Sequence, residues 1–170
     1  MKAAGIVLAV GAALALQTTL ARFVVRGTLA VDLVLVVVVY VALISGPATG
    51  LLTGTFAGLV QDALSGGGVI GIGGLAKTMV GFLSGIIGTQ FIVAQPLPRF
   101  VVFFGATVLH AVVFMGLYVL TNQRDFGTPY AAVAGKAIGN AVVGVVAFQL
   151  VELLPGAVER RRAAKTRVRR

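Results

Sequence analysis

The stretch VDLVLVVVVYVALISGPATGLLTGTFAGLVQDALSGG, residues 31–67, decides the fold class. Residues 31–44 are apolar except for Asp32 and do not alternate with polar residues, as the strands of a transmembrane barrel do. Uninterrupted apolar runs are typical of membrane helices, and Gly46-Pro47 supplies a break between two of them. The stretch therefore predicts two consecutive transmembrane helices in an all-α protein.

The composition of the whole chain agrees with this prediction. Of its 170 residues, 58% are hydrophobic and only 11% are charged, whereas about 25% of an ordinary soluble domain is charged. The mean hydropathy is +1.03. So little charge cannot coat a water-exposed surface, and the length suits one domain. The chain is expected to be a single-domain, polytopic integral membrane protein.

Six spans are predicted, with turn residues between them. They cover residues 3–21, 29–45, 47–64, 74–94, 99–121 and 129–154. The first apolar run is too long for the apolar region of a usual signal peptide, so we expect it to be retained. Pro155-Gly156 is expected to end the last helix. Residues 1–156 would then form a six-helix transmembrane domain, and residues 157–170 a basic tail.

The positive charge of the chain is concentrated in that tail. The net charge is +9, and seven of the 14 basic residues lie in RRRAAKTRVRR, residues 160–170. Basic segments beside membrane helices favour the cytoplasmic side, so an even number of spans places both termini in the cytoplasm. The tail can also attract anionic membrane lipids. It has no aromatic residue for base stacking, and nucleic acid is not an expected partner.

Glycines spaced four residues apart mark the third and fourth spans. Gly50, Gly54 and Gly58 form one stripe on a helix, and Gly81 with Gly85 repeats the spacing. Membrane helices associate closely through small residues at this spacing. The glycines therefore predict helix packing, either inside the bundle or against the transmembrane helix of a partner.

Charged and polar residues inside the spans are the candidate functional groups. Asp62 continues the glycine stripe, and Lys77 lies across a glycine-rich hairpin, so we expect these two side chains to pair. Lys136 shares one face of the sixth span with Asn140. It could compete for Asp62 or lie near Asp32 at the start of the second span. Such charges either pin the bundle together or mark a functional site.

Several motifs suggest chemistry that the rest of the chain does not support. The sequence GIGGLAKT, residues 71–78, has Ala76 where a nucleotide-binding P-loop needs glycine, and no strand precedes it. GFLSG, residues 81–85, suggests a serine hydrolase with His110, but we expect His110 to be a core residue bonded to a neighbour such as Thr107. The chain has no cysteine, one histidine and five scattered carboxylates. We expect no catalytic residues, metal site or cofactor.

Residues 31–88 resemble the MreD family, the rod shape-determining membrane proteins of bacteria. The family pattern has an acidic residue opening the second span, a Gly-Pro turn, and a glycine-spaced third span that ends in an acidic residue before Leu-Ser-Gly. It also has a glycine-rich start to the fourth span. The matching positions in this sequence are Gln17, Asp32, Gly46, Pro47, Asp62, Leu64, Ser65, Gly66 and Gly81.

The resemblance implies a non-enzymatic scaffold of the cell-elongation machinery in the bacterial cytoplasmic membrane. Proteins similar to MreD associate with MreC, a single-span protein. Through it they connect to the RodA glycosyltransferase, a class B penicillin-binding transpeptidase and MreB filaments. The six-helix fold of the family is similar to that of the S component of energy-coupling-factor transporters. In the scaffold interpretation, the small-residue faces dock the partner and the hairpin carrying Asp62 and Lys77 braces the bundle.

That fold similarity supplies the alternative function, a small-solute-binding transport subunit. It predicts a polar cavity near the outer face of the membrane, with an aromatic-lined wall. The cavity would be drawn from Gln61, Asp62, Lys77, Lys136 and Asn140.

Overall fold

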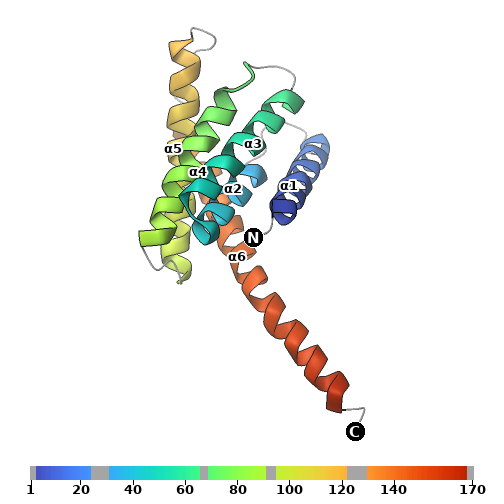
Figure 1. The fold of residues 1–170 in the computed structure, drawn as a ribbon. Coiled ribbons are helices and arrows are strands. Elements are labelled where there is room, and N and C mark those ends of the chain that lie inside the picture. Colours follow the sequence, from blue (N-terminus) through green and yellow to red (C-terminus); the bar gives the residue numbers. More distant parts are fainter. Residues whose placement is uncertain (1–2, 24–30, 66–68, 91–94, 122–129, 168–170) are drawn as a thin grey trace.

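A computed structural model describes residues 3–23, 31–65, 69–90, 95–121 and 130–167, and this part of the chain is all-helical. The described residues form six helices, and Figure 1 shows most of them gathered in one bundle. They are α1 (Ala3–Phe23), α2 (Leu33–Ser45), α3 (Pro47–Ser65), α4 (Ile72–Gln90), α5 (Pro96–Leu120) and α6 (Tyr130–Arg167).

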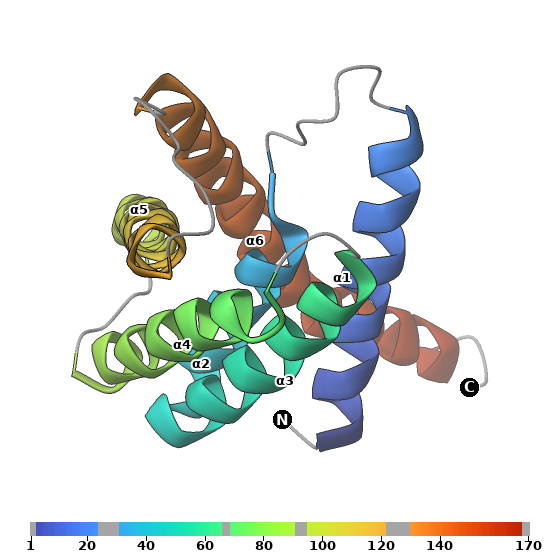
Figure 2. The same ribbon diagram turned by 90° about the horizontal axis from the view of Figure 1, so that it is seen from above.

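The shortest helix, α2, lies at the centre of the bundle. It is the helix that contacts all five others, whereas α1 packs only on α2 and α3. Seen from above in Figure 2, α2 lies beneath the α3–α4 pair, with α1 on one side and α5 on the other. A helix that is hydrophobic on every side is stable only when it is buried on every side. Eight of its 13 residues are buried, so the valine-rich run at 34–43 forms the middle of the core.

The ends of α2 and α3 follow from local chemistry. The Asp32 carboxylate accepts a hydrogen bond from the Leu35 N–H at 3.0 Å and caps the start of α2. Gly46 has φ +87°, a conformation that other residues adopt only with strain, and its N–H donates to the Ala42 carbonyl. Pro47 then begins α3, a position where its missing N–H costs nothing.

The glycine stripes pack α3 against α4, the most extensive helix–helix contact in the bundle. A Cβ atom added at Gly50, Gly54 or Gly58 would come within 3 Å of backbone atoms of α4. Gly81 meets the backbone of Gly50 in return, and Gly85 lies against the start of α3. The stripes are therefore used inside the chain, which is the first of the two alternatives that the sequence left open.

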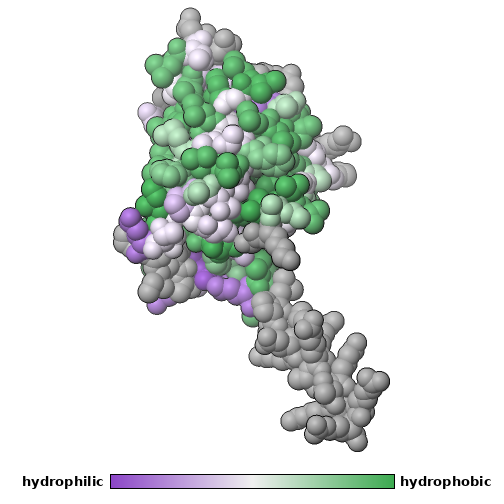
Figure 3. All heavy atoms as spheres, in the orientation of Figure 1, coloured by the Kyte–Doolittle hydropathy of each residue, from purple (hydrophilic) through white to green (hydrophobic). Residues whose placement is uncertain are grey.

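Three helices are long and apolar enough to cross a membrane by length and composition: α4, α5 and the Tyr130–Leu153 part of α6. The sequence predicted six full spans. Helix α2 has 13 residues, which span about 20 Å, against about 30 Å for the hydrocarbon core of a bilayer. Because α2 is enclosed by other helices, it does not need the length of a lipid-facing span. Figure 3 shows the apolar surface of the bundle, with hydrophilic residues toward the end from which α6 extends.

Helix α6 does not end at Pro155-Gly156, as the sequence predicted, but continues to Arg167. Pro155 removes one helical hydrogen bond, to the carbonyl four residues earlier. The bonds on either side bridge that gap, so the proline does not terminate the helix. Figure 1 shows this last part of α6 leaving the bundle. The bundle and the basic tail are therefore joined by one continuous helix, and no helix end separates them.

An ion pair joins α5 and α6 at the end of the bundle where α6 emerges. Two guanidinium nitrogens of Arg99 bond the two Glu152 carboxylate oxygens, at 2.9 and 2.5 Å. The guanidinium also lies over the Phe148 ring, 4.2 Å from its centre, as expected for a cation–π contact. Arg99 is buried, whereas Glu152 is more than half exposed. This contact holds the α5–α6 pair together far from the charged residues described next.

Candidate functional site

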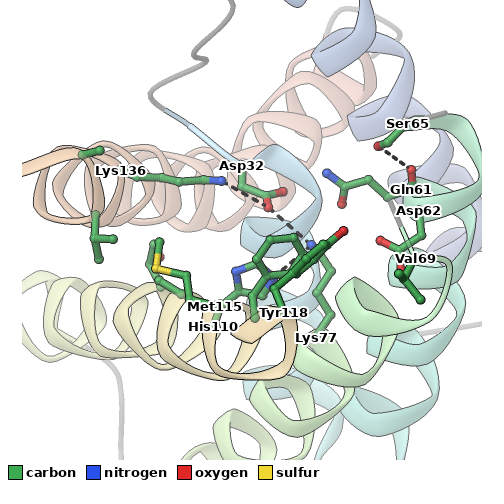
Figure 4. A pocket seen from close by; sticks show the side chains of 15 residues that line it. Asp32, Gln61, Asp62, Ser65, Val69, Lys77, His110, Met115, Tyr118 and Lys136 are labelled. Carbon is green, nitrogen blue, oxygen red and sulfur yellow. Dashed lines mark hydrogen bonds and ion pairs between the residues drawn. The ribbon is translucent and has the colours of Figure 1, made fainter. Parts of the chain in front are cut away.

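Four charged side chains, those of Asp32, Asp62, Lys77 and Lys136, line a cavity of about 530 Å³ at the end of the bundle opposite the Arg99–Glu152 pair. Figure 4 shows this cavity from close by. Its wall comes from the ends of α2, α3 and α4 and from the facing parts of α5 and α6. Four of the five residues predicted to line a polar cavity do line it: Gln61, Asp62, Lys77 and Lys136. The fifth, Asn140, is buried next to it, one helical turn beyond Lys136.

Asp32 is the centre of the charge network. Its Oδ2 lies 3.4 Å from the Lys77 Nζ and 3.8 Å from the Lys136 Nζ. Asp32 and Lys77 are buried, whereas the Lys136 side chain is 38% exposed. A buried charge is tolerated when a partner of opposite sign compensates it. Asp32 therefore neutralises Lys77 in the interior and reaches Lys136 at the cavity surface.

Lys77 has a second buried partner, the single histidine of the chain. The Lys77 Nζ lies 3.2 Å from the His110 Nε2, so this nitrogen acts as the acceptor and the histidine proton is on Nδ1. The imidazole stacks on Phe114, with ring centres 5.7 Å apart. His110 is thus a core residue bonded to a neighbour, as the sequence predicted in general. The neighbour is Lys77, and not Thr107.

The network also supplies acceptors to the first N–H groups of α2, which lie inside the bundle. Asp32 N donates to the Asn140 Oδ1 at 2.7 Å, and Val34 N donates to the Gln17 Oε1 at 3.3 Å. Together with the Asp32 cap on Leu35, these bonds come from α1, α6 and the residue before α2. Away from water, an unsatisfied backbone donor costs several kcal/mol. The polar residues therefore let a short helix begin within the apolar bundle.

Asn140 connects this helix start to α5. Its Nδ2 donates to the Thr107 Oγ1 at 3.0 Å, and Thr107 in turn donates to the Phe103 carbonyl at 2.8 Å. All three residues are buried. Asn140 thereby fixes the distance between α6, α5 and the N-terminus of α2. The sequence placed Asn140 on the correct face but gave no partner for it.

Asp62 does not pair with Lys77, which corrects the prediction from the sequence. Its Oδ2 accepts hydrogen bonds from Gly71 N at 2.9 Å and Gly74 N at 3.0 Å. These N–H groups lie at the start of α4, where the helix dipole favours a negative charge. A Cβ at Gly73 would collide with the same carboxylate. The acid closes the α3–α4 hairpin by capping a helix, and the lysine is held by Asp32.

Substitution of Asp62 by alanine is expected to lower the free energy of unfolding by about 1–2 kcal/mol, the usual cost of losing a helix cap. Asp62→Asn keeps an acceptor and should lose less. Because Lys77 is not the partner of Asp62, the charge-swapped variant Asp62→Lys/Lys77→Asp should be worse than either single variant. Reversible unfolding of the purified protein in mixed detergent measures these values. If the double variant regained the stability that the single variants lose, Asp62 and Lys77 would be paired, and the assignment of Asp62 as a helix cap would be wrong.

Two members of the network, His110 and Thr107, were not among the residues predicted for the site. Their spacing was a possible indication, because residues 107 and 110 are three positions apart and lie on one face of a single helix. The spacing alone could not place these two residues in the site, because nothing in the sequence shows that this face of α5 is directed toward Lys77 and Asn140. The predicted six-span topology with both termini inside would place Arg22, Arg26 and Arg124 on the outer side of the membrane. The side chain of Arg22 is not described, and Arg26 and Arg124 lie outside the described residues.

The arrangement is suited to binding and positioning. Within the described ranges, no three His, Cys, Asp or Glu side chains come together as a metal site. The carboxylates, the lysines and the histidine are occupied with one another or with backbone N–H groups. The cavity still presents polar groups on one side and the rings of Phe114 and Tyr118 on another.

The family model described as "rod shape-determining protein MreD" matches residues 3–154, which includes the whole bundle. No curated protein and no solved structure matches the chain.

Proposed function

This chain belongs to the MreD family of rod shape-determining proteins, and from that premise we propose that it is a non-enzymatic scaffold of the bacterial cell-elongation complex. In this role it binds an MreC-like single-span protein and, through it, a RodA-type glycosyltransferase, a class B penicillin-binding transpeptidase and MreB filaments. The observation that carries the proposal is the family match along residues 3–154, every helix of the bundle.

The packing of the bundle supports a scaffold with a fixed interior. Two stripes of glycine hold α3 on α4, a buried ion pair holds α2 on α4, and Asn140 holds α6 on α5 and α2. Since the glycine stripes are covered within the chain, the transmembrane helix of a partner must pack on another face. Exposed apolar side chains are found on α1, α5 and α6, for example Leu8, Val112 and Val142.

The proposed topology has both termini in the cytoplasm of a bacterial cell, with the protein in the cytoplasmic membrane. The start of α1 and the last part of α6 lie toward the same end of the bundle (Figure 1). The basic residues of 160–170 favour the cytoplasm for that end. The cavity then faces the outer side of the membrane.

The test is site-specific photo-crosslinking in bacterial membranes, followed by mass spectrometry of the captured proteins. A photoreactive residue at Leu8, Val112 or Val142 samples three outward faces, and Val10, which is 1% exposed, is the buried control on α1. We expect at least one outward position to capture an MreC-like protein, and the elongation synthases to follow it in mild detergent. Capture of paired ATPases with a coupling membrane subunit would replace the scaffold with a transport role.

The cavity supports a second candidate function, a small-solute-binding subunit resembling the S component of energy-coupling-factor transporters. That interpretation requires polar groups converging in a cavity with an aromatic wall. Lys77, Lys136 and Gln61 line the cavity together with Phe114 and Tyr118, and its volume lies in the range of small-molecule sites.

A further inference from the structure

Two lysines and two aspartates line the cavity, and both carboxylates are engaged within the protein. Two lysines, Lys77 and Lys136, share the single carboxylate of Asp32. The other acid in the wall, Asp62, directs its Oδ2 to two backbone N–H groups at the positive end of α4. One lysine charge therefore has no carboxylate of its own among the described residues.

Lys136 is the lysine that a ligand can reach. Its side chain is 38% exposed, whereas those of Lys77 and Asp32 are 4% and 3% exposed. Its 3.8 Å distance from Asp32 is also the longer of the two. Lys136 can turn toward an incoming anion while Asp32 remains paired with Lys77 at 3.4 Å. Figure 4 shows the long Lys136 side chain reaching toward Asp32 from α6.

The side-chain carbonyl of Gln61 is a neutral polar group in the same wall. The Oε1 of Gln61 is buried and makes no hydrogen bond with any described residue. A buried carbonyl oxygen without a donor costs about 1–3 kcal/mol. A ligand hydroxyl could supply that donor, and Figure 4 shows Gln61 projecting from α3 into the space beside Asp32 and Lys77.

The remaining wall is apolar and belongs mainly to α5 and α6. Ala111, Phe114, Met115 and Val133 lie along it. A ligand that fills the cavity must therefore combine a charged head group with an apolar portion. A ligand without an apolar portion would leave water in contact with the apolar wall.

We propose that this cavity binds an anionic head group, a phosphate that carries a free hydroxyl, with Lys136 as its counter-charge and Gln61 as acceptor for the hydroxyl. The head group can belong to a membrane lipid or to a soluble phosphate ester, which share this chemistry. The site is independent of the scaffold role, because partner binding uses outward faces. If the chain serves in transport, the same chemistry defines the class of solute.

The chain contains no cysteine, so a single introduced cysteine can report on the cavity. Met115→Cys places a thiol in its wall, and Thr121→Cys places one on the exposed end of the same helix. Both full-length variants are embedded in phosphatidylcholine nanodiscs and treated with an anionic or a cationic methanethiosulfonate reagent. We expect the anionic reagent to be favoured roughly tenfold at position 115 relative to position 121, because Lys136 is a partly exposed cation while its partner Asp32 is buried, and an accessible charge in a confined cleft concentrates ions of the opposite sign.

Lys136 is tested in the Met115→Cys background. Lys136→Gln should abolish the preference for the anionic reagent, and Lys136→Arg, which keeps the charge, should retain it. Val133→Cys serves as a second reporter in the same wall if Met115→Cys does not fold. Equal reaction with both reagents, or an unchanged preference in Lys136→Gln, would overturn the proposal.

Two competitors identify the source of the head group. Protection of position 115 in nanodiscs that contain phosphatidylglycerol assigns the site to a lipid. Protection in phosphatidylcholine nanodiscs by added glycerol 3-phosphate assigns it to a soluble ester. Gln61→Leu should weaken either protection without changing the reagent preference. If neither competitor protects position 115, the cavity does not bind this class of ligand.

Discussion

Asp32→Asn is expected to lower the free energy of unfolding by about 3–5 kcal/mol, the cost of leaving one member of a buried ion pair without its partner. Asparagine has nearly the same shape as aspartate and is an equally good helix cap, so the bond to the Leu35 N–H can be kept. The loss of stability in Asp32→Asn therefore measures the contribution of the negative charge of Asp32, separately from its role as a helix cap. Reversible unfolding in mixed detergent, followed by circular dichroism, measures it.

The control for this prediction removes the orphaned charge. Asp32→Asn/Lys77→Met should recover most of the lost stability, because an apolar side chain of similar length then replaces the buried ammonium group. Lys136→Gln should cost less than about 1 kcal/mol, since this lysine is partly exposed and its ion pair is screened. If Asp32→Asn costs no more than Lys136→Gln, Asp32 is not the charge that holds Lys77.

Gly54→Ala is expected to destabilise the bundle by about 3 kcal/mol, at the upper end of the usual cost of overpacking. The added methyl group would fall within 3 Å of the backbone of Lys77 and Thr78. A backbone cannot move aside as the end of a flexible side chain can, so α3 and α4 must separate along their whole contact. The same unfolding measurement reports the loss.

Gly116→Ala is the matched control, because a Cβ at Gly116 meets nothing within 4 Å. In that helix the same substitution should stabilise the protein by about 0.5–1 kcal/mol through helix propensity. The expected result is that Gly54→Ala lowers the free energy of unfolding and Gly116→Ala raises it. A similar loss at both would mean that glycine in these helices serves some purpose other than close packing.

The loss of stability in these variants also bears on the function. A scaffold that misfolds loses its partner, so capture of an MreC-like protein by outward positions should fall with Asp32→Asn and Gly54→Ala and persist with Gly116→Ala. The labelling experiments on the cavity change Lys136 and Gln61, which line it and are not part of the buried Asp32–Lys77 pair. Partner binding and ligand binding can therefore fail separately.

Much of the architecture could be predicted from local sequence features. The apolar runs predicted helices close to α1, α3, α4 and α5, because hydrophobicity over a span does not depend on neighbours. Gly46-Pro47 marked the turn between α2 and α3, because positive φ and a proline at the first helical position are local requirements. Pro155-Gly156 was wrong as a helix end, since a proline weakens a helix without always stopping it.

Most residues of the site were predicted from the sequence, but the contacts between them were not. Asp32, Asp62, Lys77, Lys136 and Asn140 were recognised because charges and amides inside apolar helices are rare and costly. The pairing of Asp62 with Lys77 followed from their closeness across the hairpin. It failed because Asp62 had nearer donors in the first turn of α4, and a lysine side chain is long enough to reach α2.

The sequence by itself determined that this is a membrane protein of packed helices, with glycine at the close contacts, few charges inside the apolar spans and a basic tail. These properties depend on residue type and on spacing along one helix, and both can be read from the chain. Only the tertiary structure decided that α2 is the enclosed centre, that Asp32 serves two lysines, and that His110 and Thr107 join them. Those contacts connect residues on different helices, and their geometry depends on how each helix is rotated and placed in the bundle, which no single helix specifies.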